Sequence, residues 1–347
     1  MQVVFYVSGH GFGHATRSIE LIAAIAARRA EARFIVRTSA PRWLFERDAV
    51  PIEVRPLEAD VGMVQIDGLA LDEDATATRA AHFYRDFDRL VEHEASLLRQ
   101  IGADIVLGDI PPIAFAAARR ANLPSVAIAN FTWDWIYTAY PAFERIAPDV
   151  IPTIRHAYAA ATRALRLPLH GGFEPMAKVT RDIPFIARHA ARSRDQTRRM
   201  LGVADNRRLV LASFGGYPVA LPLESHSRDS TFTTITVNQH LPSGLTHPDM
   251  VAAADVVVSK PGYGIVSECV AHDTAFLYTS RGRFAEYDVF VDQMPSVLRC
   301  RYIAQDDLLA GRWSDAIDAL LRQPAPPERP RTDGAEVAAA EILSLVR

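Results

Sequence analysis

The chain has 347 residues, of which 49% are hydrophobic and 23% are charged, and its formal net charge is −3. This balance is typical of a globular protein and excludes a disordered or fibrous chain, and the length predicts two domains of about 150 residues each. Arginine is scattered along the sequence rather than gathered into a basic stripe, which disfavours nucleic acid as a partner.

The first half of the chain alternates short apolar runs, rich in β-branched residues, with stretches of helical periodicity. The apolar runs predict strands over residues 3–8, 33–38, 52–57, 104–109 and 125–131. Helical spacing of apolar residues predicts a helix over 18–29 and one long amphipathic helix over 74–100. This alternation is typical of βαβ units that build a parallel sheet covered by helices on both faces.

The second half repeats the alternation after a connection over residues 167–175 that contains proline and glycine. Strands are predicted over residues 208–214, 231–237, 255–260 and 274–280, with helices over 264–272 and 334–346. The predicted fold class is α/β, with two Rossmann-like domains whose parallel sheets face a central cleft. We place the N-terminal domain at residues 1–180, the C-terminal domain at 181–330 and a C-terminal helix at 331–347.

The sequence also carries a prediction of location. Met1 leads directly into an apolar run with no basic leader region or cleavage-site pattern, so this run is predicted to be the first strand. No uninterrupted apolar run is long enough to span a bilayer. Two cysteines, Cys269 and Cys300, fit a reducing compartment. We therefore expect a cytoplasmic protein without a transmembrane segment.

A glycine-rich turn, GHGFGH over residues 9–14, follows the first predicted strand and opens the first helix. Its glycines permit a tight turn, and the free N–H groups of a helix N-terminus favour polar or anionic oxygens. The glycine spacing is not the dinucleotide fingerprint, which disfavours a nicotinamide or flavin enzyme. The alternative is a tight turn with two solvated histidines. A metal pair of His10 and His14 is disfavoured, because the sequence nearby offers no third ligand.

Asp109 ends a predicted strand and is followed by a double proline. In open α/β sheets ligands bind at this carboxyl edge. The strand over 104–109 is expected beside the first strand, so Asp109 can accept a hydrogen bond from a ring N–H of His14. The pair would form a dyad able to take a proton from a hydroxyl. The alternative is that Asp109 caps the following helix.

A third motif, NFTWDWIY over residues 130–137, again lies at a strand end. Aromatic faces beside amide and carboxylate groups suit a sugar, whose C–H face packs on a ring while its hydroxyls need partners. Asn130, Trp133 and Asp134 are the candidates for such a site. The alternative is that the tryptophans belong to the core.

The fourth motif, SKPGYGIVSE over residues 259–268, predicts a strand, a glycine-rich turn and a helix start. Backbone N–H groups and the helix dipole at such a turn can bind a diphosphate. Glu268, one turn into the helix, is placed to reach the two hydroxyls of a ribose. A second glycine pair, Gly215 and Gly216, ends the first strand of the C-terminal domain and would face the same phosphates.

Seven segments, in the same order over most of the chain, carry a resemblance to a known family. They are GHGFGHATR, DVGMVQIDGLALD, VLGDIPPIAF, NFTWDWIY, ASFGGYP, KPGYGIVSE and RGRFAEYDVF. They resemble the glycosyltransferase-like N-terminal domain of plant L-arabinokinases and its stand-alone bacterial relatives, and more distantly MurG-type and plant-type inverting GT-B glycosyltransferases. By this likeness His14 falls at the catalytic base, Asp109 at the dyad aspartate of plant-type members and Glu268 at the ribose-binding glutamate.

The resemblance implies a metal-independent, inverting glycosyltransferase that needs no cofactor. It would move a hexosyl or pentosyl group from a nucleotide-sugar, expected to be a UDP-sugar, to an acceptor hydroxyl. His14 and Asp109 would be catalytic. The donor would be bound by Gly215, Gly216, Lys260, Gly262, Tyr263, Gly264, Glu268 and Glu286, and the acceptor by His10, Gly11, Gly13, Asn130, Trp133 and Asp134.

The chain departs from the family pattern at three places. Two prolines within residues 217–230 predict that the helix after the first strand of the C-terminal domain is short or absent. Glu286 and Asp288 stand in place of an Asp/Gln pair, which leaves the sugar open. The galactokinase-type phosphate loop is missing, so the likeness implies no sugar-kinase activity.

Two other functions remain as alternatives to glycosyl transfer. One is a nucleotide-sugar binding module without turnover, and the other is a GT-B sugar-nucleotide epimerase or hydrolase. The pairing expected between His14 and Asp109 argues against the binding module, because binding alone needs no base.

Overall fold

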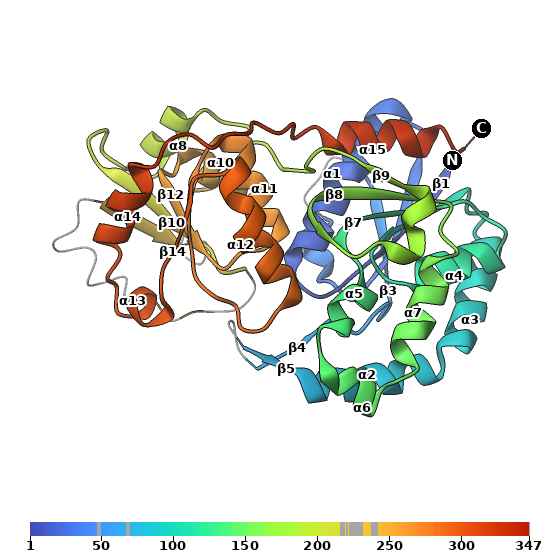
Figure 1. The fold of residues 1–347 in the computed structure, drawn as a ribbon. Coiled ribbons are helices and arrows are strands. Elements are labelled where there is room, and N and C mark those ends of the chain that lie inside the picture. The colour runs from blue at the N-terminus through green and yellow to red at the C-terminus, as the bar shows by residue number, and fades with distance from the viewer. Residues whose placement is uncertain are drawn as a thin grey trace.

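The apolar runs of the first half form a seven-stranded sheet in the computed structural model (Figure 1). All of its strand pairings are parallel. The strands, in sheet order, are β3 (Ile52–Pro56), β2 (Arg33–Thr38), β1 (Gln2–Val7), β6 (Ile105–Asp109), β7 (Ser125–Phe131), β8 (Arg163–Gly171) and β9 (Thr180–Asp182). The structure describes residues 1–46, 50–66, 70–215, 219, 221, 232–236 and 242–346.

Helices cover both faces of this sheet, because successive side chains of a strand point to opposite sides. Phe5 of β1 packs with Ile22 of α1 on one face, whereas Tyr6 packs with Leu98 of α3 and Phe115 of α4 on the other. Outside the sheet, the described residues of this domain form α1 (Phe12–Arg28), the 3-10 helix η1 (Arg42–Leu44), a β4–β5 hairpin (Val64–Gln65, Leu71–Asp72), α2 (Glu73–Arg85), α3 (Phe87–Gln100), α4 (Ile113–Arg120), α5 (Trp133–Thr138), α6 (Pro141–Ile146), α7 (Val150–Tyr158) and the 3-10 helix η2 (Glu174–Val179).

The second half forms a five-stranded parallel sheet of its own (Figure 1). Its strands, in sheet order, are β11 (Phe232–Thr236), β10 (Arg208–Ala212), β12 (Val256–Ser259), β13 (Ala275–Tyr278) and β14 (Cys300–Tyr302). Within the described part of the second half, the helices are α8 (Arg194–Met200), α10 (His247–Ala253), α11 (Tyr263–His272), α12 (Ala285–Val297), α13 (Gln305–Leu309), α14 (Ser314–Leu321) and α15 (Gly334–Leu343). Two parallel sheets in sequence confirm the predicted fold class.

Two predicted elements differ from the structure. The long helix over 74–100 is two helices, because Asp86 has φ −103° and ψ 18° and interrupts the helical backbone between α2 and α3. Residues 167–171 of the predicted connection belong to β8, which pairs with β7. Pro168 is tolerated there because it lies where the β7–β8 register shifts, and a proline in a sheet is confined to such irregular positions.

Two elements at the predicted domain boundaries, β9 and α15, pack against the first domain. Strand β9 spans the expected boundary between residues 180 and 181 and pairs with β8 in the first sheet. Helix α15 returns from the second domain and packs on α1 of the first (Figure 1). Within the described residues, no helix combines the length and the apolar character needed to cross a membrane.

Candidate active site

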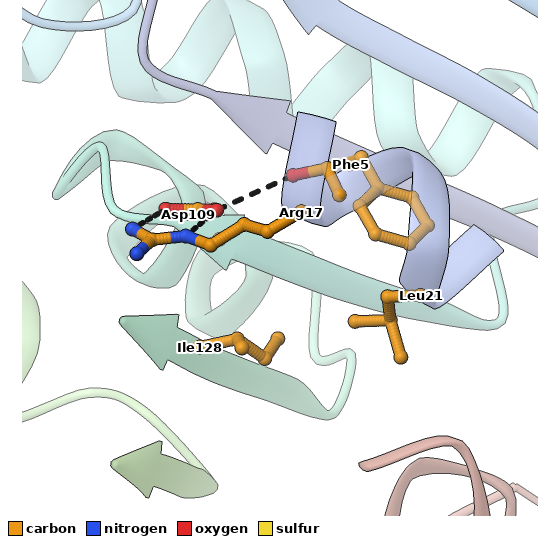
Figure 2. A pocket seen from close by; sticks show the side chains of 7 residues that line it. Phe5, Arg17, Leu21, Asp109 and Ile128 are labelled. Atoms are coloured by element: carbon orange, nitrogen blue, oxygen red, sulfur yellow. Dashed lines mark hydrogen bonds and ion pairs between the residues drawn. The ribbon is translucent and has the colours of Figure 1, made fainter. Parts of the chain in front are cut away.

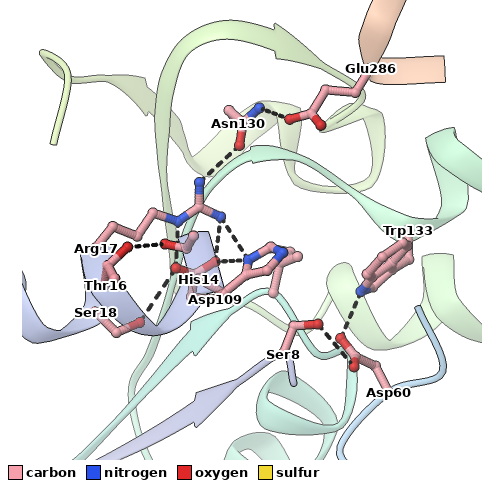
Figure 3. Close-up of polar contacts among 12 residues, drawn as sticks. Ser8, His14, Thr16, Arg17, Ser18, Asp60, Asp109, Asn130, Trp133 and Glu286 are labelled. Atoms are coloured by element: carbon pink, nitrogen blue, oxygen red, sulfur yellow. Dashed lines mark hydrogen bonds and ion pairs between the residues drawn. The ribbon is translucent and has the colours of Figure 1, made fainter. Parts of the chain in front are cut away.

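The carboxyl ends of β1 and β6 bring His14 and Asp109 together. His14 lies in the first turn of α1, and Asp109 is the last residue of β6, which pairs directly with β1. The Nδ1 atom of His14 lies 2.8 Å from Oδ1 of Asp109, and both side chains are buried. The contact expected between these two residues is present (Figure 3).

Arg17, one turn further along α1, determines the charge of Asp109. Its Nε donates to Asp109 Oδ2 at 2.5 Å, and a terminal nitrogen of the same guanidinium donates to Oδ1. Burial raises the pKa of Asp109, but the charges of Arg17 and His14 outweigh burial and hold that pKa below its usual value. Asp109 is therefore an ionised carboxylate that can only accept hydrogen bonds.

The ionised carboxylate in turn fixes the tautomer of His14. The Asp109 oxygen 2.8 Å from Nδ1 favours a proton on that nitrogen, because two lone pairs at this distance would repel. A terminal nitrogen of Arg17 also lies 3.0 Å from Nδ1, but it donates to Asp109 Oδ1, which is the stronger acceptor. In the neutral imidazole Nε2 then carries the lone pair, and no residue in the described ranges hydrogen-bonds Nε2. One ring nitrogen of His14 is therefore held by Asp109, and the other has no hydrogen-bond partner among the described residues.

Side chains of α1, β1, β6 and β7 enclose the ion pair of Arg17 and Asp109 on one side. A small pocket on that side has no room for a water molecule (Figure 2). It is lined by Phe5, Arg17, Ser18, Leu21, Gly108, Asp109 and Ile128. Because water cannot compete there, the guanidinium holds the carboxylate in one orientation.

Asn130, near the end of β7, connects this group to the C-terminal domain. Its Oδ1 accepts a hydrogen bond from Arg17 at 2.9 Å, and its Nδ2 donates to Glu286 Oε1 at 2.7 Å. Glu286 lies at the start of α12, and its other oxygen is 3.3 Å from Arg281. Glu286 was predicted to bind the donor and Asn130 the acceptor; the structure places both in one buried contact between the domains (Figure 3).

A second histidine–aspartate contact lies beside the first. His10 Nε2 is 3.2 Å from the backbone carbonyl of Asp60 and 3.5 Å from its Oδ1. Ser8 and the indole N–H of Trp133 also donate to the buried Asp60 carboxylate. An added Cβ on Gly62 would lie 2.1 Å from the His10 ring, so this glycine leaves the space in which the imidazole packs.

The two predicted acceptor residues of α5 are both buried. Trp133 faces Asp60, and its ring stacks on Tyr137 with centroids 5.5 Å apart. Asp134 accepts a hydrogen bond from Arg155 of α7 at 3.2 Å. Burial raises the pKa of Asp134 more than Arg155 lowers it. Trp133 thus supports the loop that holds His10, whereas Asp134 faces α7.

The two glycine-rich turns meet across the domain boundary. The Cα atom of Gly13 lies 3.6 Å from the position of an added Cβ on Gly264, so the first turns of α1 and α11 are in contact. Gly11, by contrast, has φ 93°, and no atom of the residues that the structure describes lies within 4 Å of such a Cβ. The N-termini of two helices, each with unsatisfied N–H groups, are thus brought together.

The turn that leads into α11 holds several predicted donor residues. Among the described residues, no atom lies within 4 Å of an added Cβ on Gly262 or Gly215. Lys260 is half-buried after β12. The Tyr263 hydroxyl accepts from the Ile186 N–H at 3.2 Å, and its ring lies 5.1 Å from the Arg17 guanidinium. Gly216 and most of the segment 217–230 lie outside the described residues.

Glu268 is held by side chains of its own domain. The Arg188 guanidinium donates to Oε1 at 2.6 Å, and His247 Nδ1 is 2.7 Å from Oε2. Burial raises the pKa of Glu268, and His247 and Arg188 together bring it below the usual value. The second ring nitrogen of His247 lies 3.0 Å from the Ser213 hydroxyl. The ribose role of Glu268 stays a prediction.

Sequence reasoning missed Arg17, Asp60 and Arg281. Arg17 and Arg281 stand in the quoted segments GHGFGHATR and RGRFAEYDVF, and Asp60 opens DVGMVQIDGLALD. Their place in these motifs is the signal that could have found them, but RGRFAEYDVF and DVGMVQIDGLALD contain other charged residues from which the sequence does not single them out. In the described part of the chain, no three or more His, Cys, Asp or Glu residues are grouped to hold a metal ion.

Fold and site together define a class of protein. Two Rossmann-like domains, joined so that their glycine-rich turns meet, are the architecture of GT-B glycosyltransferases, and the chain has this GT-B fold.

Solved structures with this fold match almost the whole chain. The calicheamicin glycosyltransferase is similar with a TM-score of 0.64 and 15% identity, over 99% of this chain and 98% of that one. The spinosyn rhamnosyltransferase complexed with thymidine diphosphate has a TM-score of 0.60 and 10% identity, over 99% and 95%. MurG of Acinetobacter baumannii has a TM-score of 0.53 and 14% identity, over 99% of each chain.

Sequence comparison identifies a particular relative. The chain is 30% identical over 343 residues to the L-arabinokinase of Arabidopsis thaliana, which confirms the resemblance seen in the motifs. The match covers 91% of this chain but 32% of the plant protein, so the chain spans about a third of that relative. No protein-family model matches the chain.

Proposed function

We propose that the protein is an inverting glycosyltransferase that moves a sugar from a nucleotide-sugar, expected to be a UDP-sugar, to an acceptor hydroxyl. One observation carries the proposal: the ionised Asp109 holds Nδ1 of His14 at 2.8 Å and leaves Nε2 available as a base. A positioned base of this kind contributes about 10²–10⁴-fold to the rate of a reaction that removes a proton.

The proposed reaction is a single displacement at the anomeric carbon. His14 Nε2 takes the proton of the acceptor hydroxyl while that oxygen bonds to the anomeric carbon. The bond from this carbon to the diphosphate breaks, and its electron pair leaves with the diphosphate. Asp109 accepts a hydrogen bond from the imidazolium that forms. A single displacement inverts the configuration, and the proposed step uses no metal ion or cofactor.

The turn before α11 offers room for the diphosphate. Gly262 has φ −160°, which any residue can adopt, and an added Cβ would meet no atom of the described chain within 4 Å. Neither the backbone conformation nor packing against the described residues therefore requires a glycine at position 262. We attribute the glycine to space that is needed for a ligand. The free N–H groups of the α11 N-terminus favour an anion at this place.

Arg281 supports an anion at the same place. Its side chain is 15% exposed. The guanidinium donates to the carbonyl of Pro261 at 3.2 Å and packs 3.9 Å from the centroid of the Phe284 ring. Burial lowers its pKa, and the Glu286 carboxylate 3.3 Å away offsets burial only in part. A largely buried cation that its neighbours do not fully balance would be stabilised by a departing diphosphate.

The fold offers a further argument for a nucleotide-sugar donor. The spinosyn rhamnosyltransferase has been solved with thymidine diphosphate and with the spinosyn aglycone. This chain shares the fold of that enzyme, and its glycine turns meet where the two domains touch. We therefore place the diphosphate at the α11 turn and the acceptor near His14 and His10.

A two-stage experiment tests the proposal. A thermal-shift screen over nucleotide-sugars first finds the donor, because a ligand that binds the folded state raises its apparent stability. Release of the nucleoside diphosphate is then followed with candidate acceptors and with water alone. Acceptor-dependent release supports glycosyl transfer, and release with water alone indicates a hydrolase. Tight binding without any release would replace the enzyme by a binding module.

A further inference from the structure

A continuous chain of side-chain hydrogen bonds runs from the C-terminal domain to His14. Glu286 accepts from Asn130 at 2.7 Å, Asn130 accepts from Arg17 at 2.9 Å, and Arg17 donates to Asp109, which holds His14 at 2.8 Å. We call these five residues the relay (Figure 3).

Each link of the relay is fixed by burial. All five side chains are buried, and Asn130 is 0% exposed. The amide of Asn130 can satisfy Arg17 only with its oxygen and Glu286 only with its nitrogen, so its orientation follows from its two neighbours. The guanidinium of Arg17 has a rigid planar fork, so a rotation of Arg17 must also turn Asp109.

The C-terminal domain contributes two of the groups that hold Arg17 in place. Glu286 acts through Asn130, and the ring of Tyr263 lies 5.1 Å from the guanidinium carbon. Burial lowers the pKa of Arg17, but Asp109 outweighs it, with smaller contributions from Tyr263 and Glu286, and the pKa stays above the usual value. The nearest charges alternate in sign along Arg281, Glu286, Arg17 and Asp109.

We propose that Arg17 and Asn130 are positioning residues that make the orientation of His14 depend on the place of Glu286 in the C-terminal domain. When α12 moves away, Asn130 loses its acceptor, Arg17 loses a fixed partner, and the carboxylate that sets the His14 tautomer is no longer held. The imidazole of His14 is thereby correctly oriented only while the C-terminal domain, which is proposed to bind the donor, is in contact with Asn130. The value of this coupling for catalysis rests on the proposed function, whereas the coupling itself does not.

The coupling can be measured without turnover. In protein labelled with ¹⁵N-histidine, the Nδ1 proton of His14 is observed by NMR and assigned by its disappearance in His14→Gln. We expect Asn130→Ala to shift or abolish this signal, although three hydrogen bonds, through Arg17 and Asp109, separate Asn130 from the imidazole. Glu286→Ala should do the same, and the double variant should add no further change, because both substitutions break one path.

Tyr140→Phe is the matched control for loosening the domain contact. The Tyr140 hydroxyl donates to the Arg283 carbonyl at 2.7 Å and accepts from the Ala285 N–H, so it also joins the N-terminal domain to the start of α12 but lies outside the relay. The His14 signal should be unchanged in this variant. An unchanged signal in both Asn130→Ala and Glu286→Ala, with the proteins folded by circular dichroism, would overturn the proposal, as would an equal change in Tyr140→Phe.

A kinetic arm separates the relay from the proposed function. In an active enzyme, Asn130→Ala should lower kcat by about 10- to 100-fold, as misplacement of a catalytic group does, and leave donor affinity within about threefold. Loss of donor affinity with an unchanged kcat would remove Asn130 from the relay. A wild type without turnover would refute the proposed function alone, because the NMR result would still decide the coupling.

Discussion

Each of the two domains contains a histidine, a carboxylate and an arginine in mutual contact. The two groups differ in whether the second ring nitrogen of the histidine is hydrogen-bonded. In the N-terminal domain Asp109 binds Arg17 and Nδ1 of His14. In the C-terminal domain Glu268 binds Arg188 and Nδ1 of His247. The difference lies in the second ring nitrogen, because Ser213 occupies Nε2 of His247 whereas no residue within the described ranges occupies that of His14.

This comparison shows that a charged trio is not by itself a catalytic signature. With both ring nitrogens hydrogen-bonded, His247 can only fix the geometry of Glu268. In the proposed reaction the open nitrogen of His14 takes the proton of the acceptor, because only its other nitrogen is held. The arginines differ as well, since the Arg17 side chain is 5% exposed and that of Arg188 is 28% exposed.

Substitution of the two histidines should give the largest difference between the two domains. We expect His14→Ala to lower turnover by about 10²–10⁴-fold, because it removes the positioned base. Donor binding should persist, since the proposed diphosphate site lies on α11. His247→Ala should mainly weaken donor binding, with kcat retained at saturating donor. Diphosphate release and calorimetry measure the two effects, and equal losses of kcat in both variants would contradict the assignment.

The buried arginine should make Asp109 the more costly carboxylate to neutralise. Asp109→Asn leaves Arg17 buried without a counter-charge, for which we expect a loss of about 3–5 kcal/mol in the free energy of unfolding. Glu268→Gln should cost less, because water can reach Arg188. Urea denaturation of the two variants gives the difference. A larger loss for Glu268→Gln would reverse the ranking of the two sites.

Glu268→Ala should weaken nucleotide-sugar binding by about 10- to 150-fold, the equivalent of one hydrogen bond to a charged group. The variant also frees Arg188 and His247, so the control is Arg188→Met, which releases Glu268 and keeps its carboxylate. Calorimetry on both variants separates a ligand contact from a disturbed pocket. Unchanged affinity in Glu268→Ala would exclude this residue from the donor site.

Gly262→Ala tests the space proposed for the diphosphate. The added methyl group meets no described atom and no backbone strain, so the free energy of unfolding should change by less than about 0.5 kcal/mol. Nucleotide affinity should fall by about tenfold or more if the methyl group meets a phosphate. Gly62→Ala, which would strike His10 and requires φ 63°, is the contrasting substitution and should destabilise the protein. A normal affinity in Gly262→Ala would move the diphosphate elsewhere.

Lowering the pH should reduce the free energy of unfolding through both carboxylates, and we expect this effect to be smaller than those of the substitutions above. The folded pKa values of Asp109 and Glu268 lie below the usual 3.8 and 4.5. Their contribution to stability is therefore complete above these usual values and is lost as the pH falls through the lower folded ones. Urea denaturation at several pH values between 7 and 3 gives the free energy of unfolding at each pH. This free energy should fall less steeply with decreasing pH in Asp109→Asn than in the wild type. The same slope in both would show that Asp109 is not the titrating group.

Much of the fold could be predicted from the sequence because it depends on local periodicity. The strands at 104–109 and 125–131, and the contact of His14 with Asp109, follow from apolar runs and from the order of strands in a parallel sheet. The break at Asp86 and the strand continuing through Pro168 depend on tertiary packing and register, which no local pattern encodes. The helix expected to be short or absent after β10 lies outside the described residues.

The site was harder to predict than the fold because its members come from distant parts of the chain. Arg17 meets Asn130 across 113 residues, and Asn130 meets Glu286 across 156. A single sequence contains no signal for such distances. Motif positions could nominate Asn130 and Glu286 as ligands, but only the three-dimensional structure places them against each other.

The return of α15 to the first domain has a consequence for how the protein is made. Ala338 and Ile342 of this helix belong to the same core as Ile22 of α1, and the Arg28 side chain donates to the Glu336 carbonyl. The core of the first domain is therefore completed by a helix that is synthesised after the whole of the second domain. At translation speeds of about 5–20 residues per second, the roughly 300 residues between α1 and α15 take about 15–60 seconds to synthesise, and the α1 surface waits that long for its cover. During that interval the nascent chain presents an incomplete apolar face to the chaperones around the ribosome.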